Sequence, residues 1–106
     1  MNIIETKDLI TFGAEFPKLA IGDKLYEVND LKETADKIDK IMNDQEMEQK
    51  EKEEKTLELA LGKANAKELM SKKLNVKSYR NLFKLILATI QGMTIKEFDE
   101  QMKAKN

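Results

Sequence analysis

The feature that most constrains this chain is one strongly apolar segment, YRNLFKLILATIQGMTIKEF at residues 79–98. It stands in a sequence whose charged residues make up 37% of the total. Its apolar residues recur at helical spacing, with Ser78 as a possible N-cap and Gly92 as a typical residue just beyond a helix end. The sequence therefore predicts a helix over residues 79–91, and the burial of that helix decides the fold.

The predicted helix is apolar over more of its circumference than one buried face requires. At 100° per residue its apolar side chains cover an arc of roughly 200°, whereas one buried face needs about 100°. Either the rest of the chain covers the whole arc, or part of it stays open for an apolar segment of another protein, as in helix-in-groove binding. The arc divides into two seams, Tyr79–Phe83–Ile86–Ile90 and Leu82–Leu85–Thr89.

A β-hairpin is predicted near the start of the chain, over residues 9–28. In FPKLAIGDKLYEV, Gly22 and Asp23 form the two-residue turn, with glycine supplying the positive φ of a type II′ turn. This register pairs Leu19 with Tyr26 and Ile21 with Lys24. Leu19, Ile21, Tyr26 and Val28 then share one face, which would pack on the helices.

The remaining segments are predicted to be helical. A long charged helix spans residues 30–61, with Asp30 as N-cap and Glu33 completing a capping box. Residues 43–56, with Met47 as their only apolar residue, are either a solvated extension of this helix or a frayed linker. After Gly62, residues 64–104 form a C-terminal helical subdomain, whose last helix has Thr94 and Glu97 as a capping box and an apolar face of Ile95, Phe98 and Met102. The prediction is a mainly α single domain over residues 1–106 with a minor β-hairpin, of α+β character.

Composition argues against an enzyme. The chain has no cysteine and no histidine, so thiolate chemistry and the commonest general base and metal ligand are missing. The carboxylates lie mostly on solvated helix faces, and neither phosphate-binding glycine motifs nor an EF-hand loop is present. We expect no catalytic residues, no metal and no cofactor. No apolar run is long enough to span a membrane, and we expect a soluble, cytoplasmic protein.

Charge is balanced overall but unevenly placed. The 19 basic and 20 acidic residues give a net charge of −1, which argues against strong general attraction to nucleic acid or membranes. Residues 30–58 nevertheless carry net −5 and residues 63–84 net +6. The two segments either face each other or the basic one faces an acidic partner. The alternative function is a small regulatory protein that binds nucleic acid through a basic patch of Lys72, Lys73, Lys77 and Arg80, although the helix 79–91 is too apolar for a DNA groove.

The order of these elements resembles a known family. The hairpin FPKLAIGDKLYEV, a charged helix, LELALGKANAKELM, a lysine-rich connection, YRNLFKLILATIQGM and TIKEFDEQM follow one another. This layout is similar to that of the tail assembly chaperones of long-tailed, siphovirus-like bacteriophages and prophages. The positions that fit the family pattern are Leu61, Gly62, Asn65, Leu69, Met70, Ser78, Tyr79, Leu82, Leu85, Ile90 and Gly92.

The resemblance implies a function without catalysis. Such proteins are mostly helical, lie in the host cytoplasm and are absent from the mature virion. They bind the tape measure protein and keep its apolar helices soluble while the tail tube polymerises, and the tail tube protein is a second candidate partner. A longer, frameshifted form is common in the family. The resemblance does not identify the contacts, but the apolar arc does: we expect the partner-binding residues to include Leu82 and Leu85 on the second seam, Leu87 at its opposite margin and Phe98 on the last helix.

Overall fold

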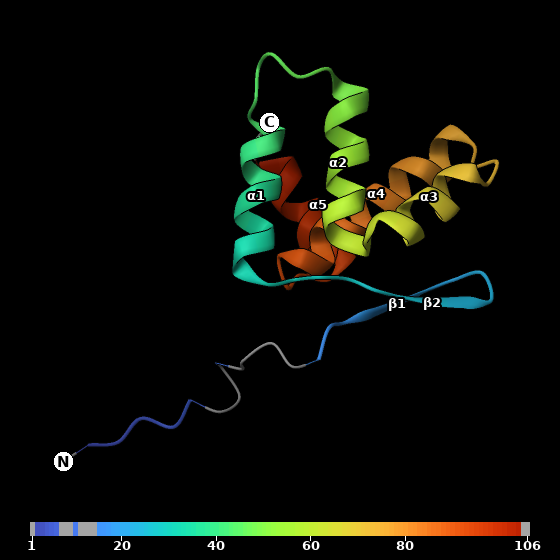
Figure 1. The fold of residues 1–106 in the computed structure, drawn as a ribbon. Coiled ribbons are helices and arrows are strands. Elements are labelled where there is room, and N and C mark those ends of the chain that lie inside the picture. Colours follow the sequence, from blue (N-terminus) through green and yellow to red (C-terminus); the bar gives the residue numbers. More distant parts are fainter. Residues whose placement is uncertain (1, 7–9, 11–14, 105–106) are drawn as a thin grey trace.

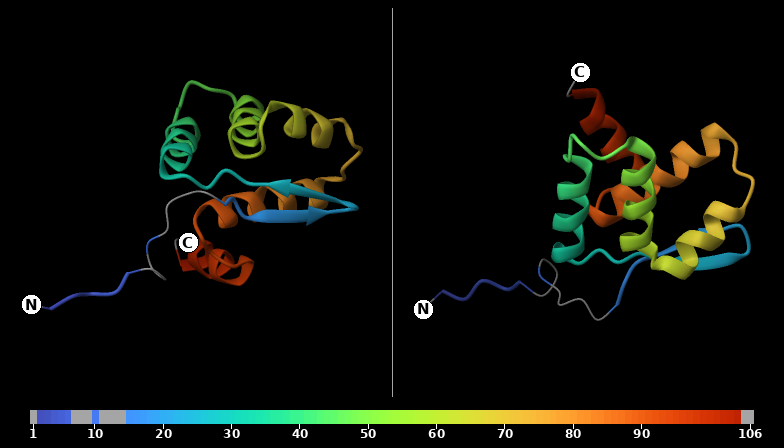
Figure 2. Two further views of the ribbon diagram at one scale, coloured as in Figure 1. Left: turned by 60° about the horizontal axis from the view of Figure 1, so that its bottom comes forward. Right: turned by 45° about the horizontal axis from the view of Figure 1, so that its top comes forward.

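The computed structural model describes residues 2–6, 10 and 15–104, and it confirms the predicted fold class (Figure 1). Within these residues the chain forms a two-stranded antiparallel hairpin followed by five helices. The left view of Figure 2 shows one layer of helices, α1 (Lys32–Met42), α2 (Gln49–Leu61) and α3 (Lys63–Ser71), and a second layer, α4 (Val76–Ile90) and α5 (Ile95–Ala104), with the hairpin crossing in front between them. Among the described residues, no helix combines the length and apolarity needed to cross a membrane.

The hairpin has the predicted register. Strands β1 (Lys18–Ile21) and β2 (Lys24–Glu27) pair Leu19 with Tyr26 and Ile21 with Lys24. Gly22 has φ +63°, and Asp23 does not have a positive φ, which agrees with a type II′ turn and excludes type I′. The strands are shorter than the predicted span of residues 9–28. Of that span, residues 9 and 11–14 lie outside the described residues.

The predicted inner face of the hairpin packs on the helices. Tyr26 and Val28 are fully buried, and Leu19 and Ile21 lie against the same core. The Tyr26 hydroxyl donates to Glu68 Oε1 of α3 at 3.0 Å, and Lys24 Nζ forms a 2.7 Å ion pair with Glu68 Oε2. The hydrogen bond from Lys24 lowers the pKa of Glu68. A single carboxylate therefore attaches two residues of β2 to α3.

The predicted continuous helix over residues 30–61 is wrong, because the chain forms two helices there. Helix α1 (Lys32–Met42) ends at Asn43, and α2 (Gln49–Leu61) begins after Glu48. In the connection the Asp44 side chain accepts a hydrogen bond from the Glu46 amide at 2.9 Å, a local bond that competes with helix formation. The break lets α1 fold back and pack beside α2, which buries apolar surface that a straight helix would expose.

The start of α1 also differs from the prediction. Its N-cap is Leu31, whose side chain makes no capping bond, so Asp30 is not the cap. The Asn29 side chain instead accepts from the Leu31 amide at 3.1 Å. Across the helix pair, Lys52 Nζ donates to the Met42 carbonyl at 3.1 Å, which satisfies one of the free carbonyls at the C-terminus of α1.

Two predicted helix ends are confirmed. Gly62 ends α2, with φ +87° and ψ +151°, and α3 (Lys63–Ser71) starts directly after it. Gly92 follows α4 (Val76–Ile90) with φ +70°. The Gly92 amide donates to the Thr89 carbonyl and the Met93 amide to the Ala88 carbonyl at 2.8 Å, the two bonds of a Schellman motif.

The predicted N-cap of the apolar helix is wrong, while that of the last helix is correct. Helix α4 starts one turn earlier than predicted, because Asn75 and not Ser78 is its cap and accepts from the Ser78 amide at 2.8 Å. Before α5 (Ile95–Ala104), Thr94 Oγ1 accepts from the Glu97 amide at 3.1 Å, as the capping box requires.

The described elements share one core, to which the hairpin and four of the helices contribute. It gathers around α2 and α4, whose Leu57 and Ile86 are almost completely buried, and α3 adds Leu69. Its buried members are Tyr26, Val28, Ile38, Leu57, Ala60, Leu61, Ala66, Leu69, Leu82 and Ile86. Helix α4 thus contributes one buried face, with Leu82 and Ile86, to a core that it shares with the hairpin, α1, α2 and α3.

Replacing Gly62 tests the α2–α3 junction. We expect Gly62→Ala to lower the free energy of unfolding by about 1–3 kcal/mol, because a residue with a Cβ rarely adopts this backbone conformation. An added Cβ would meet no atom within 4 Å, so the cost would come from backbone strain alone. Urea denaturation measures it. Gly92→Asn serves as a control with a small expected effect, because asparagine tolerates the left-handed conformation. A Gly62→Ala protein as stable as wild type would contradict the explanation.

Candidate apolar binding groove

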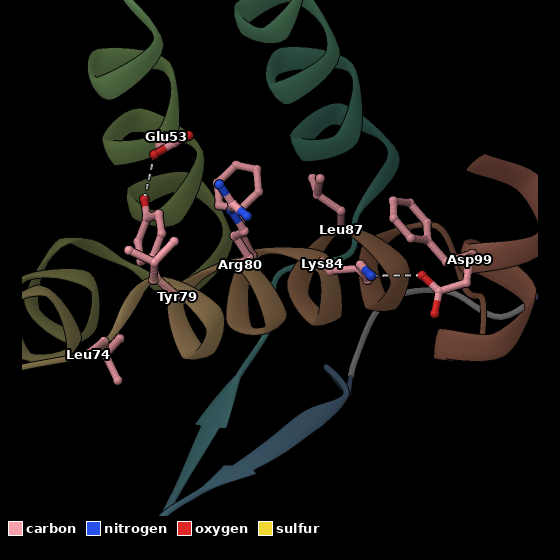
Figure 3. Close-up of a pocket in the computed structure, with 10 residues that line it drawn as sticks. Glu53, Leu74, Tyr79, Arg80, Lys84, Leu87 and Asp99 are labelled. Carbon is pink, nitrogen blue, oxygen red and sulfur yellow. Dashed lines mark hydrogen bonds and ion pairs between the residues drawn. The ribbon is translucent and has the colours of Figure 1, made fainter. Parts of the chain in front are cut away.

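An open groove of about 700 Å³ runs along α4, between the α3–α4 connection and α5 (Figure 3). We call it the α4 groove. One wall comes from α2 and the far end from α5. Its lining residues are Glu53, Leu74, Val76, Tyr79, Arg80, Phe83, Lys84, Leu87, Phe98 and Asp99.

The floor of the α4 groove is one apolar stripe of α4. Val76, Tyr79, Phe83 and Leu87 follow one another at intervals of three and four residues, which places them on the same side of a helix. Figure 3 shows Tyr79 and Leu87 on the same side of α4. The rings of Tyr79 and Phe83 lie 6.4 Å apart at 33°. Val76 remains 65% exposed, so this stripe is only partly covered by the chain itself.

Polar contacts fix the position of the groove walls. The Tyr79 hydroxyl donates to Glu53 Oε1 of α2 at 2.9 Å. At the other end, Lys84 Nζ pairs with Asp99 Oδ1 of α5 at 2.9 Å. Both members of that ion pair are about 40% exposed, so its stabilisation is small, on the order of 0.5 kcal/mol. The two contacts hold α4 to α2 and α5 without filling the groove.

Both tyrosines have raised pKa values. Burial raises the pKa of Tyr79 well above its ordinary value, and the hydrogen bond to Glu53 adds to this effect. Burial also raises the pKa of Tyr26, whose hydroxyl donates to Glu68. In each case the neutral phenol serves as the donor to a carboxylate that links two elements.

The structure places the four predicted partner-binding residues in different surroundings. Leu87 lines the α4 groove, and so does Phe98, although its side chain is only 7% exposed. Leu82 is buried in the core at 6% exposure, so its side chain has little surface to offer a partner. Leu85 is half-buried and does not line the groove. The Leu82–Leu85 seam therefore does not form this groove.

The residues that the sequence did not single out include Val76 and Leu74. Val76 falls outside the predicted apolar arc because the helix is predicted to start at Tyr79, whereas Leu74 precedes α4 and lies in the connection from α3. A helix started at Val76 would have shown the stripe of Val76, Tyr79, Phe83 and Leu87, since all four fall within roughly 80° of one another.

The predicted basic patch is exposed but spread over two elements. Lys72 and Lys73 lie in the α3–α4 connection, and Lys77 and Arg80 lie on α4. Arg80 lines the α4 groove. None of the ion pairs among the described residues joins the acidic segment 30–58 to the basic segment 63–84. The hydrogen bond from Tyr79 to Glu53 is the polar side-chain contact that joins these two segments within the described part of the chain.

Other features of the described residues are weaker candidates for a functional site than the α4 groove. They contain no group of three or more acidic side chains placed to hold a metal ion. A second hollow of about 470 Å³ lies beside the hairpin and α2, with Leu25 and Asn65 in its lining, but more polar than apolar surface faces it. Comparison with protein families, curated sequences and solved structures found no match to this chain.

A titration of the two tyrosines tests the groove wall. The chain contains only Tyr26 and Tyr79, so tyrosinate absorbance reports both. The pKa values of both tyrosines are higher in the folded protein than in the unfolded chain, where they are about 10. The two neutral phenols therefore contribute their full stabilisation of the fold below about pH 10, and this contribution is lost as the pH rises through the folded-state pKa values. We expect both to ionise above pH 10 in the folded protein and near pH 10 in urea.

The Tyr79→Phe variant assigns the signal. It should keep one high-pH tyrosine, from Tyr26, and should lose less stability than wild type as pH rises above about 10. A tyrosine that ionises at its ordinary pKa in the folded wild-type protein would contradict the two hydrogen bonds.

Proposed function

We propose that this chain is a non-enzymatic binding protein whose α4 groove holds an apolar helical segment of another protein. The observation that carries this proposal is the open stripe on α4, where Val76 is 65% and Leu74 37% exposed beside partly buried Tyr79, Phe83 and Leu87. Exposed apolar surface that lines a groove is typical of a binding site, whereas isolated exposed apolar residues are common on any protein.

The dimensions of the stripe suit a helical partner. From Val76 to Leu87 it extends over about three helical turns, or roughly 16 Å. A partner helix with apolar residues at i, i+3 or i+4 and i+7 would lay the same length of stripe against it. The charged rim, with Arg80 and Lys84 along one side, would contact the polar flank of that helix.

The partner that we propose is the tape measure protein of a long-tailed bacteriophage or prophage. This step rests on the sequence resemblance to tail assembly chaperones. It is supported by the predicted layout, since the hairpin, the α2–α3 junction at Gly62 and the helix end at Gly92 all occur in the structure. In this proposal the chain acts in the host cytoplasm, is absent from the mature virion and has the tail tube protein as a second partner.

Co-expression with the tape measure protein of the same genome tests the proposal. We expect the tape measure protein to remain in solution and to co-purify with this chain at high salt, because apolar contacts are not screened. Val76→Glu should reduce the recovered tape measure protein strongly, because it places a charge in the stripe. Ser78→Glu is the matched control, since it adds the same charge to the same turn, on the opposite side of α4.

Two outcomes would contradict the proposal. One is recovery of equal amounts of tape measure protein with Val76→Glu and wild type. The other is retention of the chain on DNA that falls steeply with salt, which would favour the nucleic-acid alternative through Lys72, Lys73 and Lys77.

A further inference from the structure

The exposed large apolar side chains of the described residues fall mainly into two groups. One group lies near the start of the chain, where Ile3 is 77%, Ile4 81% and Ile10 57% exposed. The other lies where α3 leads into α4, with Met70, Leu74 and Val76, of which the last two line the α4 groove. Leu25 of the hairpin stands apart from both. One chain thus carries both an exposed apolar segment and an open apolar groove.

We propose that residues 2–6, NIIET, of a second copy of this chain dock in the α4 groove, and that two copies exchange these segments in a symmetric dimer. We call residues 2–6 the arm. Figures 1 and 2 show the arm projecting away from its own helices, which leaves it available to a neighbouring molecule. Ile3 would cover Val76 and Leu74, the most exposed apolar residues of the groove.

Charge on the two surfaces is complementary. Arg80 is exposed, lines the α4 groove, and takes part in no ion pair among the described residues. Lys84, by contrast, is already paired with Asp99. On the arm, Glu5 directly follows the two isoleucines, and in an extended chain Ile3 and Glu5 face the same side. An arm with Ile3 in the groove therefore also turns Glu5 toward the groove, where it can form an ion pair with Arg80.

Symmetric exchange strengthens a contact that would be weak alone. In a twofold dimer each copy donates one arm and accepts one, so both contacts are identical. Once the first arm is bound, the second docks as an intramolecular step at high effective concentration. The inference rests on the groove and the arm and not on the identity of a client, so its test contains no client protein.

Sedimentation velocity of the full chain over a range of concentrations tests the dimer. We expect wild type to dimerise and Ile3→Ser/Ile4→Ser to stay monomeric at concentrations where wild type is dimeric. Asn2→Ser/Thr6→Ser is the matched control, since it changes two arm residues without removing the isoleucines, and it should dimerise like wild type. A monomeric wild type, or a dimer that survives loss of both isoleucines, would overturn the proposal.

A charge exchange identifies the contact. Glu5→Arg and Arg80→Glu should each weaken the dimer, because each places like charges together. An equimolar mixture of these two variants should dimerise again, because one arm then meets a reversed groove and the other a wild-type groove. Mixing restores nothing if each arm docks in its own chain. Two results would overturn arm exchange between copies. One is a mixture of the two variants that dimerises as weakly as each variant alone, and the other is a single variant that dimerises as strongly as wild type.

Discussion

The structure depends on the burial of one face of α4. Ile86 and Leu82 point into the core that α2, α3 and the hairpin form, and the other elements take their places around them. A chain of 106 residues has a limited supply of large apolar side chains. That supply covers the Leu82–Ile86 side of α4, where Leu57, Leu69 and Tyr26 converge, and it leaves the Val76–Leu87 stripe partly open. The α4 groove is thus the uncovered remainder of the surface that organises the fold.

Features determined by local chemistry were predictable from the sequence. The hairpin register follows from Gly22, because a two-residue turn with one positive φ fixes which residues lie opposite each other. Gly62 and Gly92 mark helix ends for the same conformational reason. The capping box of Thr94 and Glu97 needs only three residues of separation and two side-chain oxygens. None of these features depends on distant parts of the chain.

The sequence alone does not predict features for which two local structures have similar stability. Residues 43–48 favour a helix by composition, yet the Asp44 side-chain bond and the packing of α1 on α2 outweigh that preference. Asn75 and Ser78 are both good N-caps, and the choice between them moved the start of α4 by one turn. That shift leaves Val76 out of the predicted apolar arc. Of the expected binding residues, Leu87 and Phe98 line the α4 groove, whereas Leu82 lies in the core. Which part of the apolar arc stays open depends on where α2 and α5 pack against α4, and this tertiary arrangement is not encoded in the local sequence.

The two proposed uses of the α4 groove exclude each other, and this gives the groove a way to remain covered. Apolar surface that is left open promotes unspecific association. An arm from a second copy would cover the stripe until a helix with more apolar side chains displaces it. Because one groove cannot hold both, each partner must weaken the binding of the other by the same free energy. A client with a long apolar helix would then dissociate the dimer, while a short or polar segment, which gains little from the stripe, would not.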